Sequence, residues 1–289
     1  MSILPIAFLL LFQPAVTEAQ TRQLTVTVTD DKGRPIEGLT ADEIAVTENG
    51  VAREISRVEL DRRPLTVALI VDTSAPMSTF YRLQVLEPVV QFLTGLPEGA
   101  RFTVWTTGDR PKRIVDDYTT DAGAAAKALR MVFPQGGNTL FDTLVEASRD
   151  LARREGERTA VVVVTGLGIG FRNYDRQQVV REGLKSGATF LTLQIEEGRL
   201  PPGAERAGMG EVDSSDYEYV LSGLADESGG RQESTLSAMG VPSSLAKLTA
   251  ELRGQYRLEY LGLPGVEDPK VKVTVARPGA TVRMGTPRT

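Results

Sequence analysis

Asp72 and Ser74 are the residues best placed to do chemistry, because they directly follow a long apolar segment. That segment, Leu65–Val71, is nearly all apolar and is typical of a parallel strand that is buried on both faces. In open α/β sheets, ligands bind just beyond the carboxyl ends of the strands. A carboxylate and a hydroxyl at such an edge could hold an oxygen-liganded metal ion or a polar group of a partner.

The chain contains no histidine and no cysteine. This excludes disulfides, Cys nucleophiles, Ser-His-Asp triads and zinc sites built from His and Cys. An enzyme would have to work with carboxylates, Lys, Tyr or an oxygen-liganded metal. The net charge of −5, without a basic stripe, argues against nucleic-acid binding. We therefore expect a binding protein, not an enzyme.

Segments that predict strands and helices alternate through the middle of the chain. The predicted strands are 65–71, 101–107, 159–165 and 189–195, with a short edge strand at 112–116. The predicted helices are 81–96, 121–132, one through 140–151, one that begins at Asp175, 217–227 and 243–253. This order predicts an α/β domain, residues 63–253, with a doubly wound, mostly parallel sheet.

Both ends of the chain have β patterns. Near the start, Leu24–Val28 and Ile44–Val46 read as strands, and Asn49-Gly50 favours a tight hairpin turn into a strand over Val51–Val58. The tail predicts strands at 256–260, 270–276 and 281–284. Each piece is too short to close a core alone. We therefore expect 21–62 and 254–289 to pack together as one immunoglobulin-like β-sandwich that the α/β domain interrupts. Two unrelated β flaps are the alternative.

The first 19 residues resemble a signal peptide. Ile6–Phe12 is a compact apolar run, and Thr17 and Ala19 are small residues at the spacing of a cleavage site near Ala19–Gln20. The run is shorter than the roughly 20 apolar residues of a membrane span. We expect export to the periplasm or the exterior and no membrane span in the mature chain. The alternative is a buried N-terminal strand.

Three short motifs resemble the von Willebrand factor type A (VWFA) family. They are Asp72-Thr-Ser-Ala-Pro76, Gly136-Gly-Asn-Thr139 and Val164-Thr-Gly166. In that family they form a metal-ion-dependent adhesion site (MIDAS) with an Asp-x-Ser-x-Ser motif, a Thr after a Gly pair and a Thr-Asp. Flanking stretches, residues 24–50 and 248–260, resemble modules of a bacterial, Acidobacteria-type group of VWFA-related proteins. The resemblance implies the fold and export more than a named activity.

The sequence departs from the MIDAS pattern at each motif. Pro76 stands where the second Ser is expected, Gly166 replaces the Asp, and the Thr position is Asn138, with Thr139 one residue late. Mg²⁺ prefers about six oxygen ligands in near-octahedral geometry. The resemblance therefore implies a degenerate site and no resident cofactor. The candidate ligands that remain are Asp72, Ser74, Asn138 and Thr139.

Two other interpretations of this site stay open. One is that Asp72 and Ser74 only cap the following helix. The other is that they still hold Mg²⁺ weakly, as in a metal-dependent adhesion protein. A metallohydrolase that recruits Asp109 is a further alternative, although it would need more acidic ligands.

Our leading hypothesis is an exported protein that binds a protein partner through loops 73–80, 108–111, 134–139 and 166–174. The candidate contact residues in these loops are Thr73, Pro76, Asp109, Asn138 and Gly166. A structural role in an envelope assembly is the alternative, which an exposed strand edge on the β-sandwich would favour.

Overall fold

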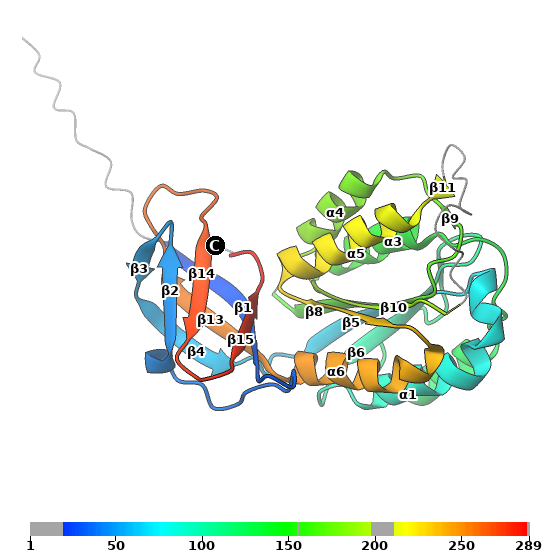
Figure 1. Ribbon diagram of the computed structural model, residues 1–289, viewed down its shortest axis with the longest axis horizontal. Helices are drawn as coiled ribbons and strands as arrows, with labels where there is room; N and C mark the ends of the chain where they lie inside the picture. Colours follow the sequence, from blue (N-terminus) through cyan, green and yellow to red (C-terminus); the bar gives the residue numbers. More distant parts are fainter. Residues whose placement is uncertain (1–19, 155, 198–210, 288–289) are drawn as a thin grey trace, which may run out of the picture.

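The computed structural model describes residues 20–154, 156–197 and 211–287. They form an α/β domain and a smaller β-sandwich that lie beside one another (Figure 1). The predicted signal peptide, residues 1–19, lies outside the described residues.

The α/β domain is built on a six-stranded sheet with the order β12-β10-β8-β5-β6-β7. β5, in the middle, pairs in parallel with β6 on one side and β8 on the other, and only the edge strand β7 runs antiparallel. β5 and β8 are buried along their whole length, which explains their continuous apolar sequences. The bounds are β5 Leu65–Val71, β6 Arg101–Thr106, β7 Lys112–Arg113, β8 Arg158–Thr165, β10 Thr189–Ile195 and β12 Arg231–Thr235.

Helices cover both faces of this sheet (Figure 1). One core lies between the sheet and α1, α2 and α6, and a second core lies between the sheet and α3, α4 and α5. Their bounds are α1 Leu86–Thr94, α2 Ala122–Arg130, α3 Leu140–Ala152, α4 Arg176–Lys185, α5 Ser214–Ser228 and α6 Val241–Arg253. The predicted doubly wound α/β fold, with β segments from both ends of the chain beside it, is confirmed.

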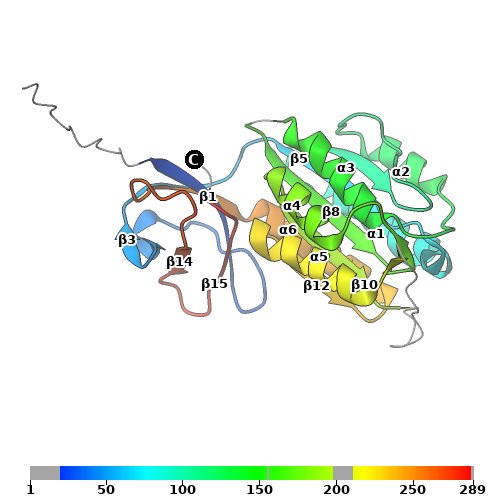
Figure 2. The same ribbon diagram turned by 90° about the horizontal axis from the view of Figure 1, so that it is seen from above.

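The β-sandwich combines strands from the two ends of the chain. One sheet has the order β15-β1-β13-β4 and the other β14-β2-β3. The first strand therefore lies among strands from the last part of the chain (Figure 2). Their apolar side chains share one core. The bounds are β1 Thr21–Thr29, β2 Ile44–Glu48, β3 Val51–Arg53, β4 Ile55–Leu60, β13 Gln255–Leu261, β14 Val271–Val275 and β15 Thr281–Met284.

The local structure differs from the sequence-based expectation at three places. Val51–Val58 is not one strand, because the chain leaves one sheet after Arg53 and joins the other at Ile55. The predicted helix from Tyr81 starts as one π-helical stretch, Tyr81–Val85, and α1 begins only at Leu86, which places Pro88 in its first turn, where proline is tolerated. The edge strand β12 was not predicted, because its sequence, RQEST, is polar.

Arg158, the first residue of β8, joins the two parts of the molecule. Its guanidinium donates to the backbone carbonyl of Asp61 at 2.9 Å and to Gln255 Oε1 at 2.8 Å, and it also donates to the carbonyl of Leu252. Asp61 lies where the chain enters the α/β domain, and Leu252 and Gln255 lie where it leaves. One buried side chain thus holds both connecting segments.

Candidate functional site

The ends of three neighbouring strands bring the candidate residues together. Asp72 follows β5, Thr107 follows β6, and Thr165 is the last residue of β8. Because β6 and β8 flank β5 in parallel register, these three side chains meet at the carboxyl edge of the sheet. This edge lies at the end of the α/β domain remote from the sandwich (Figure 1).

The carboxylate of Asp72 is fully buried and is saturated by the protein. Its Oδ1 accepts from the Ser74 amide at 2.8 Å and from the Thr107 hydroxyl at 3.2 Å. Its Oδ2 accepts at 2.9 Å from each of three donors, which are Asn138 Nδ2, the Thr165 hydroxyl and the Gly166 amide. These five hydrogen bonds fill the roughly four lone-pair positions that a carboxylate offers.

Asn138 and Thr139 have different roles. Asn138 directs its amide nitrogen at Asp72, while its Oδ1 accepts from the Leu140 amide at 3.0 Å at the start of α3. The Thr139 hydroxyl turns away and donates to the Thr107 carbonyl at 2.6 Å. Of the two candidate ligands in this motif, the structure brings only Asn138 to Asp72. Thr107 was not singled out by the sequence analysis, and Thr165, which lies in the motif Val164-Thr-Gly166, was not among the candidate ligands, although both stand at the ends of strands beside β5.

Ser74 lies close to Asp72, but its side chain forms no hydrogen bond with any of the described residues. It precedes the short 3-10 helix Ala75–Thr79, yet its hydroxyl forms no capping hydrogen bond, so the capping interpretation is wrong for this residue. Its Oγ is buried and has no hydrogen-bond partner among the described residues.

The loop that follows β8 packs closely against the segment that follows Asp72. A Cβ added at Gly166 would lie 2.7 Å from Met77 Sδ, and one added at Gly168 would lie 2.9 Å from Pro76 Cγ. Contacts under 3.0 Å do not occur without a shift of one partner. Because glycine has no Cβ, Gly166 and Gly168 allow this loop to pack directly against the side chains of Met77 and Pro76. Leu167 between them has φ of 53°, in the left-handed region that costs energy for a leucine.

These residues do not fit a divalent ion of the kind that the family's site holds. A cation needs free lone pairs on its ligands, but both Asp72 oxygens already accept hydrogen bonds, and Asn138 presents an N–H donor there. Pro76 and Gly166 have no side-chain oxygen. Within residues 20–154, 156–197 and 211–287, no three His, Cys, Asp or Glu side chains are grouped closely enough to hold a metal.

The loops at this edge are tied to one another through backbone hydrogen bonds. The Ala75 amide donates to the Gly136 carbonyl at 3.0 Å, and the Gln135 amide donates to the Thr73 carbonyl at 2.9 Å. Asn138 bonds through its own amide and carbonyl to Ile169 and Phe171. The edge is therefore ordered by contacts within the chain.

Burial corrects the expected partner-binding face. Thr73 and Asn138 are at most 5% exposed, and Gly166 is buried as well, so these three residues support the edge from within. Pro76 is half-buried and Asp109 is exposed. Thr73 is only 5% exposed but lies at the wall of a groove on this edge.

The surface of the edge carries large apolar side chains that the sequence analysis did not single out. Seven of them are 48–85% exposed and lie in the segments that follow β5, β8 and β12 or that join α2 to α3. A groove of about 670 Å³ beside β7 is lined by two of these residues and by Thr73, Asp109, Arg110 and Lys112. We call the seven residues the edge patch, which consists of Leu83, Met131, Phe133, Ile169, Phe171, Leu236 and Met239.

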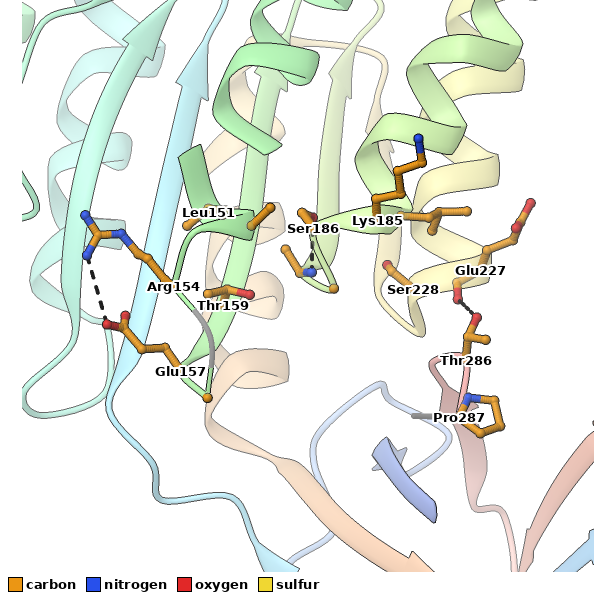
Figure 3. A pocket seen from close by; sticks show the side chains of 15 residues that line it. Leu151, Arg154, Glu157, Thr159, Lys185, Ser186, Glu227, Ser228, Thr286 and Pro287 are labelled. Atoms are coloured by element: carbon orange, nitrogen blue, oxygen red, sulfur yellow. Dashed lines mark hydrogen bonds and ion pairs between the residues drawn. The ribbon is translucent and has the colours of Figure 1, made fainter. Parts of the chain in front are cut away.

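A second cavity, of about 480 Å³, lies at the opposite ends of the strands (Figure 3). Two of its cations are already paired with carboxylates, since Arg154 lies 4.0 Å from Glu157 and Lys185 lies 2.7 Å from Glu182. We therefore assign no ligand to this cavity. Among the described residues, no helix has both the length and the hydropathy of a membrane span.

The sequence matches no known family profile and no curated protein. Its fold, however, is similar to solved structures. A von Willebrand factor type A protein from Catenulispora acidiphila is 11% identical, with a TM-score of 0.52 over 95% of this chain and 75% of that one. Proximal thread matrix protein 1 from the mussel byssus, with a zinc-occupied MIDAS motif, is 16% identical, with a TM-score of 0.52 over 70% of this chain. This chain spans only 48% of the mussel protein. The α/β domain described here therefore has the von Willebrand factor type A fold.

Proposed function

We propose that this chain is an exported, non-enzymatic binding protein that holds a protein partner at the carboxyl edge of its VWFA-like sheet without a metal ion. The observation that carries the proposal is the saturated carboxylate of Asp72. In this arrangement, the hydrogen-bond donors of Asn138, Thr107, Thr165 and two backbone amides take the place of a cation. The site is thus a degenerate MIDAS that orders loops and offers no open coordination position.

The edge patch supports a role in protein binding. Exposed apolar side chains that gather on one part of a protein surface commonly mark an interaction site. Seven large apolar side chains at one edge, next to a groove with Asp109, Arg110 and Lys112, have the mixed character of a protein interface. Because the loops are already ordered by hydrogen bonds within the chain, a partner would lose little free energy in fixing them.

The composition of the chain and the burial of Asp72 support a non-enzymatic role. The chain has no histidine and no cysteine, and Asp72, the one carboxylate at the centre of the site, is buried under its own donors. A general base must reach the proton that it removes, and Asp72 has no free lone pair with which to do so.

Calorimetry tests the metal-free part of this proposal. We expect no saturable heat when the purified protein is titrated with Mg²⁺ or Mn²⁺. A saturable heat that disappears in Asp72→Ala would overturn the proposal in favour of a metal-dependent adhesion protein.

Capture from envelope extract tests the binding part. We expect one partner to be retained in the presence of a chelator, and to be lost with Phe133→Glu or Met239→Glu in the edge patch. Val51→Glu is the matched control, because Val51 is also an exposed apolar residue, at 50%, but lies in the sandwich. Loss of the partner with Val51→Glu alone would show that the binding site lies on the sandwich and not on the edge patch.

A further inference from the structure

The outer edge of β4 in the sandwich is a sheet edge whose backbone groups pair with no other strand among the described residues. β4 pairs only with β13. The Asp61 amide donates to the Gln255 carbonyl at 2.8 Å, so Asp61 faces β13. Because backbone direction alternates along a strand, Val58 and Leu60 point their N–H and C=O groups away from β13. No backbone hydrogen bond from the described residues reaches these groups.

The side chains of β4 form a self-complementary sequence. Val58 is half-buried and packs on the core side, while Arg57 and Glu59 stand on the outer side, 53% and 47% exposed. Their mutual distance within one chain is 3.6 Å, and they lie two positions apart on the same strand. A second β4 placed antiparallel about Val58 would set each Arg57 directly opposite the Glu59 of the other chain.

We propose that two copies of this chain associate through β4, antiparallel and centred on Val58, so that their four-stranded sheets join into one. The two Val58 residues would exchange backbone hydrogen bonds, as their outward direction allows. The flanking Arg57 and Glu59 would form two reciprocal ion pairs in the closely spaced, non-hydrogen-bonded positions. The contact uses the same patch on both copies, which is the usual geometry of a twofold dimer.

Charge selects this register over its neighbours. Centring the pair on Arg57 would place two arginines opposite each other, and centring it on Glu59 would place two glutamates opposite each other. Like charges directly opposite destabilise a strand pair. Arg57 and Glu59 also face β13, so backbone direction excludes them as centres. Leu60 points outward, but centring the pair on it would place Glu59 opposite Asp61 of the other chain. The register about Val58 fits the backbone direction and forms two reciprocal ion pairs within β4. Since a pair of six-residue strands buries little surface, we expect a dimer with a Kd between about 1 µM and about 1 mM.

A charge-swap experiment with the full-length chain tests the proposal. Sedimentation of the wild type from about 5 µM to about 500 µM should show a concentration-dependent dimer. Arg57→Glu and Glu59→Arg should each weaken it by about tenfold or more, because each places two like-charged pairs across the interface. The double variant R57E/E59R should restore it. Lys272→Glu is the control, as it makes the same change of charge on an exposed residue of the other sheet.

Mixing the two single variants gives the decisive measurement. In a mixed dimer, one chain carries glutamate at both positions and the other carries arginine at both, so each cross-strand pair joins opposite charges. An equimolar mixture should therefore dimerise although neither variant does so alone. The intrachain pair between Arg57 and Glu59 stays broken in both chains and cannot produce this result. A wild type that is monomeric throughout, or a mixture no more dimeric than its components, would overturn the proposal.

Discussion

The side chain of Asn138 serves two neighbours at once. Its amide nitrogen donates to Asp72, and its oxygen accepts from the Leu140 amide at the start of α3. This division explains why an asparagine fits here. A threonine, as in the intact family motif, lacks the second polar atom, and an aspartate would face Asp72 with a second negative charge.

Asn138→Asp separates these two tasks. The new carboxylate can still accept from Leu140, but it places two carboxylates about 2.9 Å apart with no donor between them. We expect a lower Tm in the presence of a chelator, and a rise in Tm on adding Mg²⁺, because two carboxylates with nearby hydroxyls form an oxygen site. Thermal melts with and without Mg²⁺ check this. Asn138→Ala is the control, which should be destabilised without any response to Mg²⁺.

Ser74 provides the complementary prediction. Its buried hydroxyl has no partner among the described residues, so Ser74→Ala should leave the free energy of unfolding unchanged or raise it by up to about 1 kcal/mol. Asp72→Ala should cost about 3 kcal/mol or more, since it leaves several buried donors unpaired. Urea unfolding of both variants measures the difference. A large loss for Ser74→Ala would show that this hydroxyl has a role that the hydrogen bonds do not reveal.

At the scale of elements, the position of the loops at the carboxyl edge of the sheet depends on the N-terminal caps of the helices that follow them. α4 follows the segment that carries Ile169 and the short strand β9, Gly170–Phe171. The Asp175 carboxylate accepts from the Gln178 amide at 2.8 Å, and the Gln178 side chain accepts from the Asp175 amide at 3.0 Å, which is a complete capping box.

Asp175→Ala should destabilise the protein by about 1 kcal/mol, because it leaves amides at the start of α4 without their acceptor. Gln177→Ala, at an exposed position in the same turn, should have almost no effect. Urea unfolding gives the cost, and hydrogen exchange at the first amides of α4 shows whether the loss is local. Equal protection of these amides in both variants would contradict the capping role.

The sequence predicted those elements whose burial is simple and failed where tertiary context decides. β5 and β8 were predicted because burial on both faces demands continuous apolar residues. β12 was missed because an edge strand needs few apolar residues. Only Glu233 of its five residues is buried. The break at Glu54 was missed because the residues before it and after it both have strand propensity. They differ only in the sheet that each segment joins.

The same limit applies to the site. Asp72 and Ser74 stand out because they follow an apolar run, and Asn138 stands out because of the glycine pair before it. Thr107 carries no such signal, and Thr165, although it lies in the motif Val164-Thr-Gly166, carries none that predicts a hydrogen bond to Asp72. Their role follows from the strand order, which places β6 and β8 on either side of β5, and the sequence pattern does not contain that order.

At the scale of the molecule, the two proposed contacts lie in different parts of it. The edge patch is at the carboxyl ends of the central strands, remote from the sandwich (Figure 1), and β4 belongs to the sandwich. A rigid connection between them requires that both connecting segments be fixed. Arg158 does this from β8, and Asp61 is held in turn by Arg63, whose Nη2 lies 2.6 Å from Asp61 Oδ2.

The stability that this connection gives to the folded protein should depend on pH, because it involves the carboxyl of Asp61. Burial alone would raise the pKa of its carboxyl, but the hydrogen bonds from Arg63 and the positive charges of Arg63 and Arg158 bring the pKa below its ordinary value of 3.8. A carboxyl whose pKa is lowered in the folded state stabilises that state above its unfolded pKa. This contribution should be complete above about pH 5 and should fade as the pH falls below 3.8 toward the folded pKa.

Asp61→Asn isolates that contribution. The variant should be less stable than the wild type at pH 7, and the difference should shrink as the pH falls below 3.8 toward the folded pKa, because the wild-type carboxyl then takes up a proton, first in the unfolded state and then in the folded state. Urea unfolding at a series of pH values measures the difference. Asp175→Ala is a suitable comparison, since it removes a carboxylate far from the connecting segments. If the difference for Asp61→Asn stayed constant down to pH values well below 3.8, the ion pair with Arg63 and Arg158 would not be what fixes the two parts together.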